Sequence, residues 1–214
     1  MKEPRTRHDI FETEFDKSEP FKSWWIRKWC GHLDQYAKWG WAIIPISIRG
    51  KRPLSYQTNY PSKGPAGPYL KREEAEYWVS NDFNLAVTAG PSKIIWCDID
   101  DPSAFNALRN HDKLMQFLVM RTPRGYAMPI KDGAGGQALD RLTERGFDFR
   151  DDVSYELVPL SETCLNDHHL HGSHHPGPRE SCTNGQAHKY YIREWITSLT
   201  NPMVTIQEFV RLIS

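Results

Sequence analysis

The chain has 214 residues, with 27 basic and 27 acidic side chains, so its formal net charge is zero when histidine is neutral. This length suffices for one substantial hydrophobic core, and the balanced charge excludes a protein that binds polyanions through a global positive field. No apolar run approaches the roughly 20 residues of a transmembrane helix, and the charged start is unlike a secretory signal. We therefore expect a cytoplasmic protein without a membrane partner.

Hydrophobic periodicity and turn residues predict helices and strands that alternate along one core. In chain order we expect helix 21–40, strand 41–47, helix 71–81, strands 84–90 and 93–100, helix 102–117, a hairpin of strands 118–123 and 125–130, helix 135–146, strand 154–162, a strand merging into a helix over 189–196, and helix 205–214. Such an order is typical of an α+β or α/β domain.

The segment KIIWCDIDDP (93–102) runs from an apolar strand directly into clustered carboxylates. Side chains alternate between the two faces of a strand, so Asp98 and Asp100 are expected on one face. Two such carboxylates repel each other unless they are solvated, protonated or bridged by cations, and Mg²⁺ and Mn²⁺ prefer oxygen ligands. The pattern fits either a metal site or a solvated acidic turn, with Asp101 capping a helix that begins at Pro102.

Further charged residues lie close to predicted turns. Lys51 and Arg52 follow a glycine and precede a proline, which suits either contact with phosphate or a solvated basic turn. Asp148 precedes strand 154–162, and a neighbouring strand could bring it to the acidic pair. Arg150 follows it and either balances a metal site or pairs with Asp151 or Asp152.

Residues 161–182 contain five of the nine histidines and two of the four cysteines, in a segment without an apolar core. Structural zinc sites take four nitrogen or sulfur ligands, and the metal would also supply folding energy to such a segment. We therefore predict a structural Zn²⁺ in an insertion spanning 161–188. The alternative is a polar loop in which the histidines cluster by chance.

Several segments, in order from Gly40 to Tyr191, resemble motifs of the prim-pol family of the archaeo-eukaryotic primase superfamily, most closely the domains of archaeal plasmid replication proteins. The resemblance is carried by GWAIIPISIRGKRPL, NLAVTAG, IIWCDID, TPRGYAMPI and FDFRDDVSYELVPLS. It implies an α+β fold in which an RRM-like catalytic core joins an N-terminal α/β subdomain and a zinc-binding insertion. On this basis we expect an arm and helix over 1–39, a catalytic domain over 40–196 and a C-terminal helix over 197–214.

The resemblance also implies a reaction, which is template-directed nucleotidyl transfer. Asp98, Asp100 and Asp148 would hold Mg²⁺ or Mn²⁺ in a two-metal mechanism, and Ser161 would lie near the nucleotide unless it merely ends a strand. The expected partners are a single-stranded DNA template, nucleoside triphosphates, and a helicase or another protein that replicates a plasmid, virus or other mobile element. The zinc stem of the family suggests four ligands, namely His169, His171, Cys182 and either Cys164 or His174.

One motif departs from the family pattern. A gapless reading places the family's phosphate-contacting histidine at Met128, and a shortened turn places it at Tyr126 or Ala127. An anion site needs positive charge more than imidazole, so Arg124 or Lys131 would take its place. Because of this departure, an alternative interpretation is a catalytically weakened module with a primase fold, which binds single-stranded DNA without polymerising. A metal-dependent phosphodiesterase or nuclease is a third interpretation of the clustered carboxylates.

Overall fold

The computed structural model describes residues 20–46, 53, 69–81, 83–106, 108, 110–131, 147–150, 154–164 and 190–213. Its elements in chain order are α2 (Pro20–Trp39), β1 (Ile43–Ile46), α3 (Arg72–Ser80), β2 (Asn84–Thr88), η2 (Gly90–Ser92), β3 (Ile94–Ile99), α4 (Pro102–Asn106), α5 (His111–Leu114), β4 (Met120–Arg121), β5 (Tyr126–Lys131), β6 (Phe147–Arg150), β7 (Tyr155–Leu157), β8 (Glu162–Cys164), β9 (Tyr190–Ile192), β10 (Glu194–Trp195), β11 (Val204–Thr205) and α8 (Ile206–Ile213). This mixture confirms the predicted α+β class.

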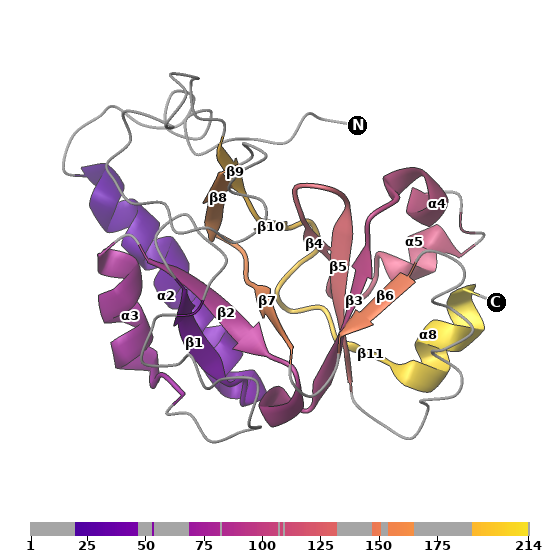
Figure 1. The fold of residues 1–214 in the computed structure, drawn as a ribbon, viewed down its shortest axis with the longest axis horizontal. Helices are drawn as coiled ribbons and strands as arrows, with labels where there is room; N and C mark the ends of the chain where they lie inside the picture. Colours follow the sequence, from indigo (N-terminus) through magenta and orange to yellow (C-terminus); the bar gives the residue numbers. More distant parts are fainter. Residues whose placement is uncertain are drawn as a thin grey trace.

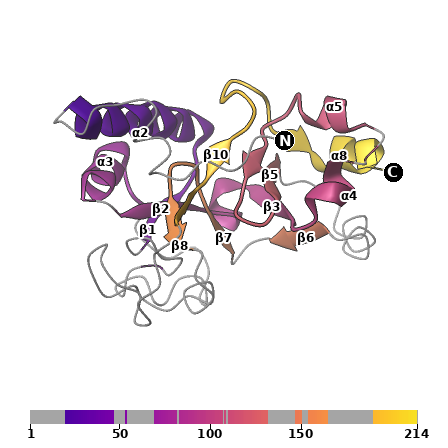
Figure 2. The same ribbon diagram turned by 90° about the horizontal axis from the view of Figure 1, so that it is seen from above.

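The first half of the chain, together with β7, forms a small α/β unit (Figure 1). Strands β1, β2 and β7 make an antiparallel sheet in the order β1-β2-β7, and helices α2 and α3 lie together on one side of it (Figure 2). The apolar stripe of α2, which includes Trp25, Trp29 and Leu33, is buried. The helix ends at Gly40, whose φ of +70° is a conformation that glycine adopts without strain.

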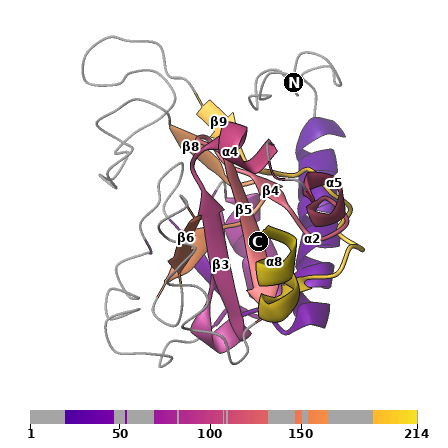
Figure 3. The ribbon, with the colours of Figure 1, turned by 90° about the vertical axis from the view of Figure 1, so that its right-hand side faces the viewer.

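The second sheet carries the acidic strand β3 between two partners, β5 and β6. Its order is β10-β4-β5-β3-β6, and β11 also pairs with β5. Helix α8 covers the face that is turned away from the first sheet (Figures 1 and 3). Because side chains alternate along β3, Ile95, Cys97 and Ile99 belong to the core beneath α8. Trp96 belongs to the core shared with the first unit, so Asp98 is on the face toward that unit.

Most expected elements are confirmed to within a few residues, but three expectations are wrong. The helix expected over 102–117 is split into α4 and α5, because Asn110 donates its side-chain amide to the carbonyl of Leu212 at 2.9 Å. The strand expected over 154–162 bends after β7, where Leu160 has a φ of +73°. At this bend the amide of Leu160 donates to the carbonyl of Arg193 at 2.8 Å, so a tertiary hydrogen bond accompanies both departures from the expected elements.

The helix expected at the end of segment 189–196 does not form. Its two halves are strands of different sheets, since β9 pairs with β8 and β10 pairs with β4. Between them the backbone of Arg193 bonds to Ser161 and Leu160, which keeps the chain extended. The helix expected over 135–146 lies outside the described residues, and so does the arm before residue 20.

Candidate functional site

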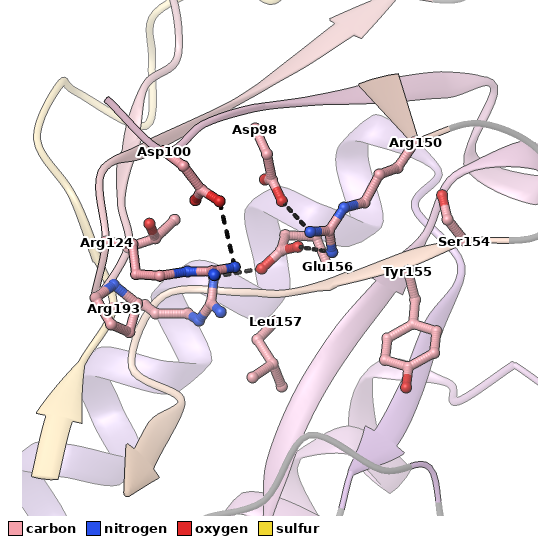
Figure 4. A pocket seen from close by; sticks show the side chains of 11 residues that line it. Asp98, Asp100, Arg124, Arg150, Ser154, Tyr155, Glu156, Leu157 and Arg193 are labelled. Atoms are coloured by element: carbon pink, nitrogen blue, oxygen red, sulfur yellow. Dashed lines mark hydrogen bonds and ion pairs between the residues drawn. The ribbon is translucent and has the colours of Figure 1, made fainter. Parts of the chain in front are cut away.

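A cavity of about 310 Å³ lies between the two sheets, and its walls are lined with charge. Figure 4 shows the charged lining side chains pointing toward one another from several elements. They include three carboxylates and three guanidinium groups, from Asp98, Asp100, Glu156, Arg124, Arg150 and Arg193. The three negative and three positive groups balance in formal charge. The carboxylates could bind cations and the guanidinium groups could bind phosphates, so the cavity suits a ligand that contains both.

Two of the predicted acidic residues meet through strand register. Asp98 on β3 is the direct partner of Asp148 on β6 in the antiparallel pair, and paired residues project from the same face. Asp100 follows the end of β3, and its side chain is 57% exposed. The expectation that a neighbouring strand aims Asp148 at the pair thus matches the topology, although that strand is β6 itself and not the one that begins at residue 154.

Arg150 lies among these carboxylates (Figure 4). Its Nη2 is 2.5 Å from Oδ2 of Asp98, its Nη1 is 3.2 Å from Oε2 of Glu156, and its Nε is 3.4 Å from Oδ2 of Asp148. One guanidinium therefore compensates three acidic side chains. Its sequence-based alternative, a pairing with Asp151 or Asp152, involves residues outside the described part of the chain.

Sequence reasoning missed Glu156 and Arg193, which form a buried ion pair. Each is only 4% exposed, and the remaining oxygen of Glu156 accepts from Arg150. A buried charge needs a partner, because desolvation without one costs several kcal/mol. The available signals were the single charge in YELVPL and the arginine that directly follows the apolar residues YYI, since a charge at such a position is often paired inside the protein.

Asp98 is the most perturbed carboxyl in the cavity. Burial, with the nearby negative charge of Glu156, raises its pKa to about 7, while Arg150 and Arg193 oppose this rise. Its Oδ1 is buried and has no hydrogen-bond partner. A carboxylate oxygen in this condition is costly to keep ionised, and a bound cation would satisfy it.

A tight turn brings Arg124 against Asp100. The amide of Gly125 donates to Oγ1 of Thr122 at 3.0 Å, which closes the turn between β4 and β5. A Cβ at Gly125 would lie 1.9 Å from the carbonyl oxygen of Ile99, so only glycine allows this approach. Nη2 of Arg124 then reaches Oδ2 of Asp100 at 3.3 Å.

The position of the missing histidine can now be assigned to a face of β5. Ala127 pairs with Asp98 in register and therefore shares its face. Tyr126 and Met128 are buried in the core beneath α8. Among the three candidate positions, Ala127 is the one on the face of the acidic pair, and its methyl group offers no charge to an anion.

Two predicted nucleotide contacts lie away from the cavity. Lys131 pairs with Ile94, at the end of β3 opposite to Asp100. Ser161 is fully buried, and its hydroxyl donates to the carbonyl of Leu85 at 3.0 Å. Ser161 thus joins β2 to the segment between β7 and β8, and it does not line the cavity.

Several predicted residues lie outside the described residues. They are Lys51, Arg52, His169, His171, His174 and Cys182. Cys164 ends strand β8, where it pairs with Tyr190 in the backbone register. The zinc site stays a prediction.

Within the described ranges, no group of three or more His, Cys, Asp or Glu side chains is arranged to hold a metal ion. The donor set nevertheless suits a divalent cation, because Asp98 and Asp148 share a face and one oxygen of Asp98 lacks a partner. Arg150 contacts both carboxylates in this arrangement. A cation would fit this site if the guanidinium moved from the oxygens that it now contacts.

Comparison with known proteins gives one family. The model of the family described as "Prim-Pol: Bifunctional DNA primase/polymerase, N-terminal" matches residues 33–191. This range includes the acidic strand, Asp148 and Glu156. No curated protein matches the chain. In the described part of the chain, no helix combines the length and apolar character that crossing a membrane requires.

Proposed function

Because the chain belongs to the Prim-Pol family of bifunctional DNA primases/polymerases, we propose that it makes or extends primers on a single-stranded DNA template during replication of a plasmid, virus or other mobile element. The observation that carries this proposal is the register pairing of Asp148 with Asp98, which lines a charged cavity. Nucleoside triphosphates are the proposed substrates, and a helicase or another replication protein is the proposed partner.

Asp98, Asp100 and Asp148 would hold Mg²⁺ or Mn²⁺ in this reaction. When bound, such ions supply activation of the attacking 3′-hydroxyl and neutralisation of the triphosphate charge. The rigid placement of Asp98 supports this role, since β3 is paired on both sides, by β5 and β6. Alignment and charge compensation provide most of the catalysis in phosphoryl transfer.

The positive side chains of the cavity would bind the triphosphate. The Arg124 side chain is 64% exposed and reaches Asp100 through one nitrogen only, so its other donors are available to phosphate oxygens. A guanidinium suits this task because its planar donors match phosphate geometry. Arg124 would thereby replace the charge of the histidine that Ala127 lacks.

The proposal is tested by removing two of the carboxylates with little change in shape. The double variant D98N/D100N should lose Mg²⁺- and Mn²⁺-dependent primer synthesis and extension, measured with a labelled primer on a DNA template. The matched control is D112N, which removes the charge of a fully exposed side chain on α5 and should retain activity. Wild-type rates in the double variant would disprove the assignment.

A second candidate function is a primase-fold module that binds single-stranded DNA without polymerising. Ala127 favours it, because the face of the acidic pair lacks the imidazole that the family resemblance leads us to expect. Binding of a fluorescent oligonucleotide by wild-type protein, with no incorporation under Mg²⁺ or Mn²⁺, would establish this alternative. Any template-dependent incorporation that D98N/D100N abolishes would exclude it.

A further inference from the structure

Arg150 makes an unusual set of contacts for one side chain. Each of its three guanidinium nitrogens lies near a different carboxylate, at 2.5 Å from Asp98, 3.2 Å from Glu156 and 3.4 Å from Asp148. Two of these carboxylates are the proposed cation ligands, and the third is not. The guanidinium therefore joins the proposed cation ligands to Glu156, and Figure 4 shows its contacts with Asp98 and Glu156.

The contacts with Asp98 and Asp148 exclude a cation from the same oxygens. A divalent ion that binds both carboxylates at about 2.0–2.6 Å would repel a guanidinium in contact with either of them. The arrangement of the described acidic residues agrees with this competition, since none of their groupings is ready to hold a metal. Arg150 also satisfies Asp98 incompletely, because Oδ1 remains without a partner.

The third contact gives Arg150 a place to remain when the other two are lost. Glu156 is buried, and its two oxygens are divided between two arginines, Oε1 accepting from Arg193 and Oε2 from Arg150. Glu156 is thus held in place by Arg193 whether or not Arg150 keeps its contacts with the aspartates. The Arg150 side chain is 35% exposed and lines the cavity, so it has room to turn inward.

We infer that Arg150 is an exchangeable counter-ion of the site. It neutralises Asp98 and Asp148 before a divalent cation binds, and it leaves them for the phosphates of the incoming nucleotide when the cation arrives. Glu156 tethers the guanidinium during this exchange. No bond is made or broken, and each charge keeps a partner because carboxylate oxygens are replaced by phosphate oxygens. This inference rests on the proposed function, since it requires a divalent cation at the aspartates.

The inference predicts effects of opposite sign for one substitution. R150Q removes the competitor, so Mn²⁺ alone should bind about tenfold more tightly. The same variant lacks the phosphate contact, so a non-hydrolysable deoxynucleoside triphosphate with Mn²⁺ should bind about tenfold more weakly than to wild type. A purely structural Arg150 would weaken both equilibria, and a distant surface charge would change neither.

Both equilibria are measured on the whole chain without DNA or turnover. Free Mn²⁺ is quantified by electron paramagnetic resonance, and nucleotide binding by calorimetry at saturating Mn²⁺. The matched control is R211Q, which removes one exposed arginine charge from α8 and should leave both affinities unchanged. If R150Q does not fold, R150K serves in its place, because a single ammonium cannot contact three carboxylates and should give smaller changes of the same two signs.

Unchanged or weaker Mn²⁺ binding in the folded variant would overturn the inference, and so would unchanged nucleotide affinity. These failures leave the proposed function intact as long as wild type binds Mn²⁺ and D98N/D100N does not. If that double variant binds Mn²⁺ as wild type does, the aspartates are not ligands. The proposed function and the inference would then both fail.

Discussion

Replacing Asp98 by asparagine should stabilise the protein while it abolishes the proposed activity. The carboxyl is buried beside Glu156, and this environment raises its pKa from 3.8 to about 7. At pH 8 the native state therefore carries an ionised group in surroundings that disfavour ionisation. Asparagine has nearly the same shape and no charge, so D98N avoids this cost, and Arg150 retains its other two carboxylates.

The magnitude follows from the linkage between proton binding and folding. A native pKa above the unfolded value means that the native state binds more protons between about pH 4 and pH 7, so wild-type stability falls as the pH rises through this range. At about 1.4 kcal/mol per pH unit, the difference between 3.8 and about 7 sets an upper limit of about 4 kcal/mol. We expect D98N to gain about 2–4 kcal/mol in the free energy of unfolding at pH 8, and little at pH 4.

Urea denaturation followed by tryptophan fluorescence at pH 4 and pH 8, without added Mg²⁺ or Mn²⁺, measures this difference. Added Mn²⁺ should stabilise wild type more than D98N, because the ion compensates the charge that the variant lacks. D112N, at a fully exposed aspartate, should resemble wild type at both pH values. The reasoning is refuted if D98N is less stable than wild type at pH 8, or if the difference between them does not depend on pH.

Three further predictions concern the scaffold and the insertion. G125A should lower the free energy of unfolding by about 1–3 kcal/mol, because the new Cβ would meet the carbonyl of Ile99. The matched control is G31A, because nothing lies within 4 Å of its new Cβ. Thermal denaturation should show that G31A is more stable than wild type by up to about 1 kcal/mol. E156Q should lower the free energy of unfolding, measured by urea denaturation, by about 3–5 kcal/mol, since it leaves the buried Arg193 without its charged partner. A loss below about 1 kcal/mol would contradict the conclusion that Arg193 depends on this ion pair. If the insertion over 161–188 binds structural zinc, elemental analysis should find one ion per chain and its removal should lower the melting temperature; zinc-free protein of equal stability would disprove the site.

Local sequence patterns were sufficient to predict most elements and one part of the site. The apolar run of β3, the stripe of α2 and the turn residues are short-range signals, and the elements that they predict are confirmed within a few residues. The alternation of a strand likewise indicated that Asp98 and Asp100 share a face. The capping role expected for Asp101 is confirmed, because its Oδ1 accepts from the amide of Ser103 at 2.8 Å.

Tertiary structure decided the partners of these residues. Asp148 meets Asp98 through the register of β3 with β6, and Glu156 meets Arg193 across 37 residues of chain. Register and long-range pairing depend on how whole strands pack, so alternation within one strand cannot reveal them. Ala127 shows the same limit, since its face became known only when β5 was aligned beside β3.

That an apolar strand ends in paired carboxylates follows from the residues alone, because side-chain alternation and hydrophobic periodicity are local properties of the chain. Folding is what places Arg150 between Asp98 and Glu156, and a close backbone approach at Gly125 brings Arg124 to Asp100. Charges from distant segments interact strongly only when folding brings them together and removes water from between them.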